Sequence, residues 1–209
     1  MQDCHMEQGS APEDSPGRDL HQDKGRRILE AAMEIFSIRP YHQVKVEDIA
    51  VRARVGKGTV YEYYRSKNEL FLAVFEEAGR IYMGEMEASL DRDGSAVEKF
   101  QVLVATHIAF IMKHRQRAIL MVSQQRQVAP REVHQAFLKR QGRLLSLVRD
   151  TIHQGIREGA FRPVDGDLAS LFVMGGILSL WPLALKDRQA ALQKKGNEVV
   201  DLVLRCLQG

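Results

Sequence analysis

The 209-residue chain has only two cysteines and no long apolar run. Cys4 and Cys206 stand near opposite ends, and two cysteines so placed do not form the disulfide framework of a small secreted domain. The apolar stretches are too short or too polar to span a bilayer, and no basic segment followed by an apolar run marks a signal peptide. These absences predict a cytoplasmic protein that has no membrane partner.

The patterns of common catalytic and metal sites are also missing. We find no phosphate-binding glycine loop, nucleophile elbow or paired-carboxylate helix, so no catalytic residue is expected. The histidines are scattered, and His107 and His114, which are two helical turns apart, have no carboxylate or cysteine companion in the sequence. We therefore expect neither an enzyme nor a bound metal or other cofactor.

The chain is rich in apolar residues spaced as on one face of a helix, and no credible strand is found. The expected helices cover residues 24–39, 46–53, a short stretch from about 57, 68–90, 97–113, 118–123, 130–158, 165–183 and 199–207. Asp165 or Asp167 can cap the penultimate helix, and Asn197 can cap the last. The predicted fold class is all-α, with about nine helices.

Charge is distributed unevenly along the chain. Residues 1–23 hold six acidic residues and one arginine, a net charge of −5, whereas residues 24–67 hold ten basic and five acidic residues, a net charge of +5. Residues 1–22 also contain almost no apolar side chains, so we expect a disordered acidic tail. The basic segment has the charge that a phosphate-binding surface needs, although a solvated basic face has the same composition.

Residues 44–70 have the pattern of two short helices joined by a tight turn, a helix-turn-helix. In such a motif the N-terminal residues of the second helix approach the edges of bases in the major groove. We expect Lys57 to donate to guanine, and Thr59 to contact a thymine methyl group or donate to phosphate. Gly58 would let the backbone come close to DNA.

Three tyrosines in this segment cannot share one role, because they do not lie on one face of the helix. We expect Tyr61 and Tyr63 to reach outward to phosphates or bases and Tyr64 to pack inward. Lys67 is placed to hold a flanking phosphate, and Glu62 either accepts from a cytosine amino group or faces solvent. The alternative interpretation is an ordinary helical hairpin whose tyrosines form the edge of a core.

The segment VEDIAVRARVGKGTVYEYYRSKNEL resembles the DNA-binding domain of the TetR family of bacterial transcriptional regulators. The resemblance covers roughly residues 24–75. Beyond it, the chain resembles the family in helical layout and length, and the run GIREGAFRPVDGDLAS is similar to the usual entry into the family's penultimate helix.

Two residues depart from the family pattern. Arg54 stands where the family usually has glycine, and a left-handed conformation there would cost about 1 kcal/mol. Lys45 stands where a capping Thr or Ser is usual. Each of these residues could instead contact a DNA phosphate, or indicate a DNA-binding domain that docks on DNA in a way that differs from the family.

The resemblance implies a helix-turn-helix DNA-binding domain over residues 23–67 and a helical effector-binding and dimerisation domain over residues 68–209. The partner would be a double-stranded DNA operator. The expected DNA-binding residues are Lys45, Val46, Arg54, Lys57, Gly58, Thr59, Tyr61, Glu62, Tyr63 and Lys67.

One short recognition helix reads only a few base pairs, so specificity calls for two copies on a palindrome. The last two helices are more apolar than an outer layer of a monomer needs. Together with the resemblance, this predicts a homodimer formed through those helices. The alternative is that both helices are buried within the monomer.

The resemblance also implies a cavity among the middle helices for a small-molecule effector of unknown identity, which we expect to be largely apolar. Methionine and aromatic side chains suit varied apolar ligands, although a core uses the same residues. His107 is the strongest polar candidate for ligand binding, but a histidine buried in the core would give the same sequence pattern. The candidate ligand-binding residues are Met83, Met86, Phe100, His107, Phe110, Met121, Gln124, Phe137 and Trp181.

These features predict a ligand-responsive homodimer that binds DNA and acts as a repressor. The alternative is a helical protein that binds a small molecule but does not bind DNA sequence-specifically, for which Lys45 and Arg54 are the only hints.

Overall fold

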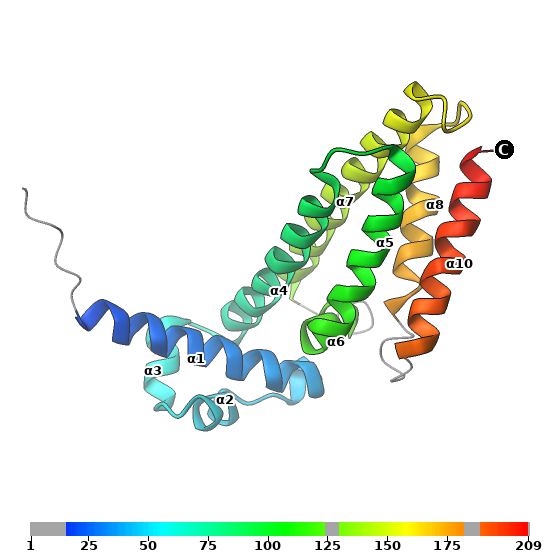
Figure 1. The fold of residues 1–209 in the computed structure, drawn as a ribbon. Helices are drawn as coiled ribbons and strands as arrows, with labels where there is room; N and C mark the ends of the chain where they lie inside the picture. Colours follow the sequence, from blue (N-terminus) through cyan, green and yellow to red (C-terminus); the bar gives the residue numbers. More distant parts are fainter. Residues whose placement is uncertain (1–15, 124–129, 182–188, 209) are drawn as a thin grey trace, which may run out of the picture.

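The computed structural model describes residues 16–123, 130–181 and 189–208, and these ranges contain nine α-helices, one short 3-10 helix and no strand (Figure 1). The prediction of an all-α fold is therefore confirmed. The elements are α1 Pro16–Ile38, η1 Tyr41–Gln43, α2 Val46–Ala53, α3 Lys57–Tyr63, α4 Lys67–Leu90, α5 Ala96–Lys113, α6 Arg115–Ser123, α7 Arg131–Arg157, α8 Gly166–Leu178 and α10 Gln189–Gln208.

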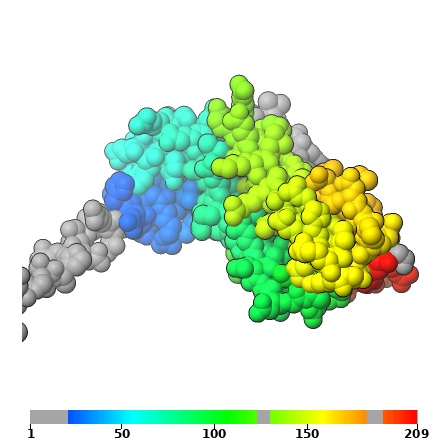
Figure 2. All heavy atoms as spheres, turned by 90° about the horizontal axis from the view of Figure 1, so that it is seen from above, coloured from blue at the N-terminus to red at the C-terminus, as the bar shows by residue number. Residues whose placement is uncertain are grey.

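Helices α1 to α3 form a small head at one end of a bundle of longer helices (Figure 1). In the space-filling view the head, coloured blue and cyan, lies directly against the bundle (Figure 2). The aromatic rings of Phe36 in α1 and Phe71 in α4 lie 4.6 Å apart, and those of Tyr41 and Phe71 lie 4.9 Å apart. The first turns of α4 therefore belong to the core of the head as well as to the bundle.

In the bundle, α4 packs against α5 and α7, α7 packs against α8, and α10 packs against both α5 and α8. Helix α6 is short and contacts α1 of the head as well as α4 and α5. Two elements of the bundle, α4 and α6, thus reach the head.

The first helix begins earlier than the sequence predicted. Residues 16–22 were expected to belong to a disordered tail, but they form the start of α1. The ring of His21 stacks on Tyr63 of α3 with ring centroids 4.4 Å apart, and the Tyr63 hydroxyl donates to the His21 carbonyl at 2.7 Å. This contact between distant parts of the chain holds the helix at His21 against α3, and residues 1–15 lie outside the described ranges.

The start of α8 confirms one of the two predicted caps, because Asp165 accepts hydrogen bonds from the backbone N–H groups of Asp167 and Leu168. The predicted end near residue 183 is wrong, since α8 ends at Leu178. Just beyond it, the Ser179 hydroxyl donates to the carbonyl of Gly176 at 2.6 Å. Glycine is a weak helix former and serine competes for backbone hydrogen bonds, so the helix stops within the apolar run.

The final helix is longer than predicted. It begins at Gln189, so Asn197 lies inside α10 and does not cap it. The early turns of α10 pack on α5: Leu192 is buried, and a Cβ added at Gly196 would lie 2.0 Å from Cδ1 of Ile108. Tertiary packing therefore extends a helix whose early residues are mostly polar.

Candidate functional site

The turn between α2 and α3 keeps its left-handed conformation although an arginine occupies it. Arg54 has φ 57° and ψ 48°, and among the described residues it is the only one besides glycine with a positive φ. The Arg27 guanidinium of α1 donates to the carbonyls of Ala53 and Arg54 at 2.9 and 3.0 Å. A cation at the C-terminus of a helix is favourable, so Arg27 offsets part of the strain in the turn.

The start of α2 lacks a side-chain cap, as the lysine at the capping position predicted. Lys45 has an extended backbone and makes no side-chain hydrogen bond to the helix. Glu47 and Asp48 supply negative charge to the first turn instead. Val46 was expected to contact DNA, but its side chain is only 6% exposed and packs in the core, so that prediction is wrong for the side chain.

The start of α3 presents an open polar surface. Lys57, Gly58, Tyr61 and Glu62 are exposed, and a Cβ added at Gly58 would meet no atom within 4 Å. Thr59, at the same end of the helix, is half-buried. This surface contains residues that were predicted to contact bases in the DNA major groove.

Lys57 is held by an acidic neighbour. Its Nζ lies 2.6 Å from Oε1 of Glu47 and 5.8 Å from the centroid of the Tyr61 ring. The hydrogen bond with Glu47 raises the pKa of Lys57. The exposed ammonium has further N–H donors, so Lys57 can turn toward a base with or without loss of this ion pair.

Tyr63 does not point outward as predicted. Its ring is half-buried against α1, where a Cβ added at Gly25 would lie 3.0 Å from Cε1 of Tyr63. The small size of Gly25 makes room for the ring, and the stack on His21 holds it there. Tyr64 is half-buried, as expected, and burial raises the pKa of its hydroxyl.

Lys67 also has a partner inside the head. Its Nζ donates to the carbonyls of Tyr41 and Val44 at 3.1 Å each and lies 4.4 Å from the centroid of the Tyr41 ring. In this structure Lys67 joins the start of α4 to η1, and its contact with phosphate stays a prediction.

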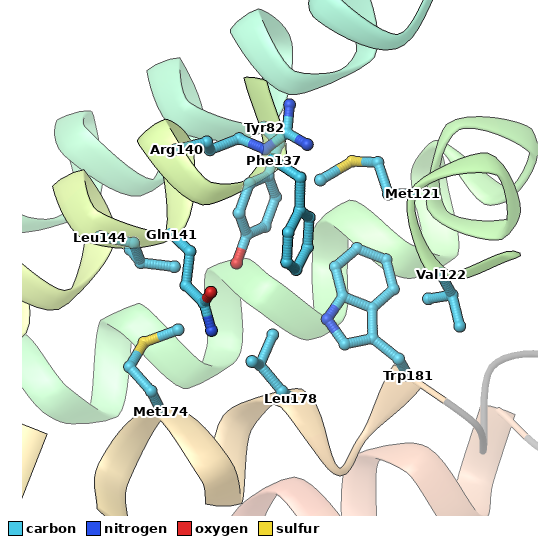
Figure 3. Close-up of a pocket in the computed structure, with 10 residues that line it drawn as sticks. All are labelled: Tyr82, Met121, Val122, Phe137, Arg140, Gln141, Leu144, Met174, Leu178 and Trp181. Atoms are coloured by element: carbon cyan, nitrogen blue, oxygen red, sulfur yellow. The ribbon is translucent and has the colours of Figure 1, made fainter. Parts of the chain in front are cut away.

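A small, mostly apolar cavity lies between α4, α6, α7 and α8 (Figure 3). Its volume is about 40 Å³, enough for a few water molecules but far below the several hundred Å³ of a typical ligand pocket. The lining residues are Tyr82, Met121, Val122, Phe137, Arg140, Gln141, Leu144, Met174, Leu178 and Trp181.

Of the predicted ligand-binding residues, Met121, Phe137 and Trp181 line this cavity. Met86, Phe100 and Phe110 do not, because their fully buried side chains pack in the core. Met83 lines a separate groove between α4 and α7, and Gln124 lies outside the described residues.

His107 lies one layer behind the cavity and does not line it. Its Nδ1 is 3.0 Å from the Tyr82 hydroxyl, and its ring packs edge-on against Trp181 with centroids 4.9 Å apart. Nε2 is buried without a hydrogen bond of good geometry. Burial lowers the pKa of His107 to about 3, and the carbonyl of Ile177 opposes this only in part, so the ring is neutral.

Sequence reasoning missed the polar lining residues Arg140 and Gln141. A signal was present, because Arg140 falls within the apolar stripe of α7 that includes Val133, Phe137 and Leu144. A charged residue within such a stripe is forced toward the interior, where unpaired charges are costly.

Within the described ranges, no three His, Cys, Asp or Glu side chains are grouped so that they could hold a metal ion. His114 does have a carboxylate neighbour, since its Nε2 lies 3.2 Å from Glu85 of α4, but no third ligand joins them there. Among the described helices, none is both long and apolar enough to cross a membrane.

Two family models match the two parts of the chain. The model described as "Bacterial regulatory proteins, tetR family" matches residues 28–74, which contain the helix-turn-helix, and "Tetracyclin repressor-like, C-terminal domain" matches residues 93–181. The chain belongs to the TetR family. It is a TetR-family transcriptional regulator with an N-terminal DNA-binding domain and a helical C-terminal domain.

Individual relatives agree with this assignment over most of the chain. The fatty acid metabolism regulator protein of Bacillus subtilis is 25% identical over 185 residues, which cover 87% of this chain and 94% of that protein. The HTH-type transcriptional repressor KstR2 of Mycobacterium tuberculosis is 24% identical over 70% of this chain and 74% of that protein. Both are regulators, in line with the expectation that this TetR-family chain is not an enzyme.

A solved structure shares the fold of this TetR-family chain. The transcriptional regulator FadR from Bacillus subtilis, in complex with stearoyl-CoA, superposes with a TM-score of 0.74 at 24% identity. The match covers 86% of this chain and 97% of that one, so both the head and the bundle are included.

Proposed function

We propose that this TetR-family regulator is a repressor that binds a palindromic operator as a homodimer and releases it when a largely apolar small molecule enters the cavity. The observation that carries the proposal is the span of α4. Phe71 near its start packs against Phe36 of the head, whereas Tyr82 of the same helix lines the cavity. A ligand that moves Tyr82 would therefore act on the helix that supports the head.

In the proposed DNA complex, α3 enters the major groove and Lys57 exchanges Glu47 for a guanine. Lys45 and Arg54 are exposed at the two ends of α2, where they can contact flanking phosphates. The alternative of a head that no longer binds DNA has less support, because the turn at Arg54 keeps the left-handed form that glycine would adopt.

A second copy of the chain is the proposed partner of α8 and α10. Large apolar side chains are exposed on these helices, among them Leu168, Leu171 and Phe172 on α8 and Leu202 on α10. The two helices lie side by side at the edge of the bundle away from the head (Figure 1). An exposed apolar face of this kind supports an interface. Pairing through it would present two heads to half-sites about one helical turn apart or more.

The proposed effector acts by binding one arrangement of the helices more tightly than the other. The cavity of about 40 Å³ is too small for most ligands, so binding must separate the helices that surround it. Helix α6 provides a second route to the head, because Met121 lines the cavity and the same helix contacts α1. Stearoyl-CoA in the FadR structure supports an effector with a large apolar part. Action on the chromosome would place the protein in the bacterial cytoplasm.

The direct test is an electrophoretic mobility shift on the promoter region of the chain's own gene. We expect sequence-selective binding that weakens as salt rises, because basic residues displace counterions from DNA. Replacing both Lys57 and Tyr61 with Ala should abolish selective binding and leave the circular dichroism spectrum unchanged. The matched control is Arg157→Ala, which removes an exposed cation at the far end of α7. Selective binding that survives the double replacement would refute the proposed reading helix.

A further inference from the structure

Arg140 of α7 is a half-buried cation that is near the charge of Glu76 but forms no ion pair with a described residue. Its guanidinium carbon lies 4.4 Å from the centroid of the Phe75 ring, and its Nη2 is shielded from solvent with no hydrogen-bond partner. Within the described residues, no carboxylate comes within ion-pairing distance of Arg140. An unpaired buried charge is costly, so its presence calls for a reason.

The structure makes room for this guanidinium at one position on the facing helix. A Cβ added at Gly79 of α4 would lie 1.6 Å from Nη1 of Arg140. Any side chain at Gly79 would thus push the guanidinium away. Arg140 therefore occupies a gap between α4 and α7 that only glycine leaves open.

The gap has an apolar side and a basic side. On its inner side Arg140 lines the apolar cavity, and Figure 3 shows it close to Tyr82 and Phe137. On its outer side Arg140 lines an open groove of about 480 Å³ between α4 and α7. The cavity and the groove thus meet at a single cationic side chain.

The outer groove carries mainly positive charge. Arg80, Lys139 and Arg143 line it together with Arg140, and Glu76 is its single acidic residue. Arg80 and Arg143 are paired with glutamates of α4 outside the groove, whereas Lys139 is exposed. An anion in the groove would therefore meet an excess of cations.

We propose that Arg140 binds the anionic group of an amphiphilic effector, whose apolar chain lies in the inner cavity and whose carboxylate or phosphate faces the basic groove. This inference rests on the proposed role of the cavity as the effector site. The anion would give Nη2 the partner that it lacks in the free protein. Burial lowers the pKa of Arg140 to about 10, so the guanidinium remains charged at neutral pH.

A purely structural role makes a different prediction. If Arg140 only packs on Phe75, its loss weakens the bundle but does not distinguish charged ligands from neutral ones. The decisive measurement is therefore the ratio of affinities for an anionic and a neutral ligand with the same chain. DNA is not needed for this measurement.

Trp181 provides the readout, because it is the single tryptophan of the chain and it lines the cavity. Its fluorescence is followed while the full-length protein is titrated with decanoate, decanoyl-CoA, decanol or coenzyme A alone. Decanoate tests a carboxylate, decanoyl-CoA tests phosphates, and coenzyme A tests the head group without a chain. We expect the wild-type protein to bind at least one of the two anionic amphiphiles more tightly than decanol.

Arg140→Gln should weaken the preferred anion by about tenfold to a hundredfold, as expected for loss of a charged hydrogen bond, and leave decanol within about twofold. The control Arg157→Gln removes an exposed cation from the same helix and should change neither affinity. Equal weakening of anion and alcohol, or no change in either, would overturn the proposal. Failure of every amphiphile to bind the wild-type protein would also overturn it, while the operator assay would still report on DNA binding.

Gly79→Ala tests the same geometry without removing a charge. The added Cβ must displace the guanidinium, whereas alanine is a better helix former than glycine. We expect the anion preference to fall as in Arg140→Gln, with no decrease in Tm. An unchanged preference would show that the position of the guanidinium does not matter.

Discussion

The Tyr82 hydroxyl and Nδ1 of His107 lie 3.0 Å apart in the interior, between the cavity and the core. Tyr82 lines the cavity and His107 does not, so the pair connects the proposed effector site to α5. Burial raises the pKa of Tyr82 and lowers that of His107, and both groups therefore stay neutral at physiological pH. With both groups neutral, the Tyr82 hydroxyl can donate a hydrogen bond to Nδ1 of His107.

The first prediction concerns acid stability. The pKa of His107 falls from an ordinary 6.5 to about 3 in the folded protein, so between these values the unfolded chain binds the additional proton. The free energy of unfolding is therefore not reduced by His107 above pH 6.5. Below pH 6.5 it decreases by up to about 1.4 kcal/mol for each pH unit. Chemical unfolding from pH 7 to pH 5 measures this slope. In His107→Leu the slope should be smaller, and an identical slope would contradict the assignment.

The second prediction concerns the ion pair of Lys57 and Glu47. Glu47→Gln frees Lys57 and removes a carboxylate that would lie near the phosphates of DNA, so operator affinity should rise by up to about fivefold. Lys57→Ala should lower affinity by about tenfold or more through loss of a base contact. Both are measured by fluorescence anisotropy with labelled operator. A lower affinity in Glu47→Gln would indicate that the ion pair itself orients α3.

The third prediction separates two roles of Arg54. Arg54→Gly relieves the left-handed backbone and should raise stability by up to about 1 kcal/mol in thermal unfolding. If Arg54 also contacts phosphate, the same variant binds operator more weakly, and its salt dependence decreases by about one counterion. Arg54→Asn is the control, because asparagine tolerates this conformation but carries no charge. Unchanged DNA binding in both variants would leave Arg54 without a DNA contact.

The fourth prediction concerns the exposed face of α8. Phe172→Arg places a charge in the proposed dimer interface and should yield a monomer that keeps its helical content. Operator affinity should fall with the loss of the second head. Sedimentation velocity measures the change in mass. The matched control is Leu138→Arg, which replaces an exposed leucine of α7 on another part of the bundle. A dimer that persists in Phe172→Arg would exclude this face as the interface.

The position of the helix-turn-helix and the exposed start of its second helix could be predicted from the sequence because these features are local, whereas the burial of Val46 and the inward turn of Tyr63 could not. The missing cap at Lys45 depends on a few consecutive residues, and so does the cap of α8 at Asp165, whereas the left-handed turn at Arg54 is also held by Arg27 of α1. The exposed start of α3 follows from its polar residues and glycines in the same way. The net charge of residues 24–67 also follows directly from their composition.

The cavity could be predicted only in part. Periodicity indicates that Met86, Phe100 and Phe110 are buried, and they are, but it does not indicate which neighbours they meet. Core and cavity use the same apolar side chains, so choosing between them requires the relative placement of α4, α6, α7 and α8. The inward position of Arg140 could be predicted from the apolar stripe of α7, but its place beside Gly79 could not, since α4 and α7 form that gap jointly.

The helical class and the position of the DNA-binding motif follow from the sequence, because helix periodicity and turn residues act over a few positions. The packing of the helices sets three further features: Tyr63 packs on His21, Lys67 donates to carbonyls in and just after η1, and Arg140 lies between cavity and groove. These three side chains are long, and their partners lie in other helices or segments. Which partner such a side chain reaches depends on how the elements pack, a property that no single stretch of sequence contains.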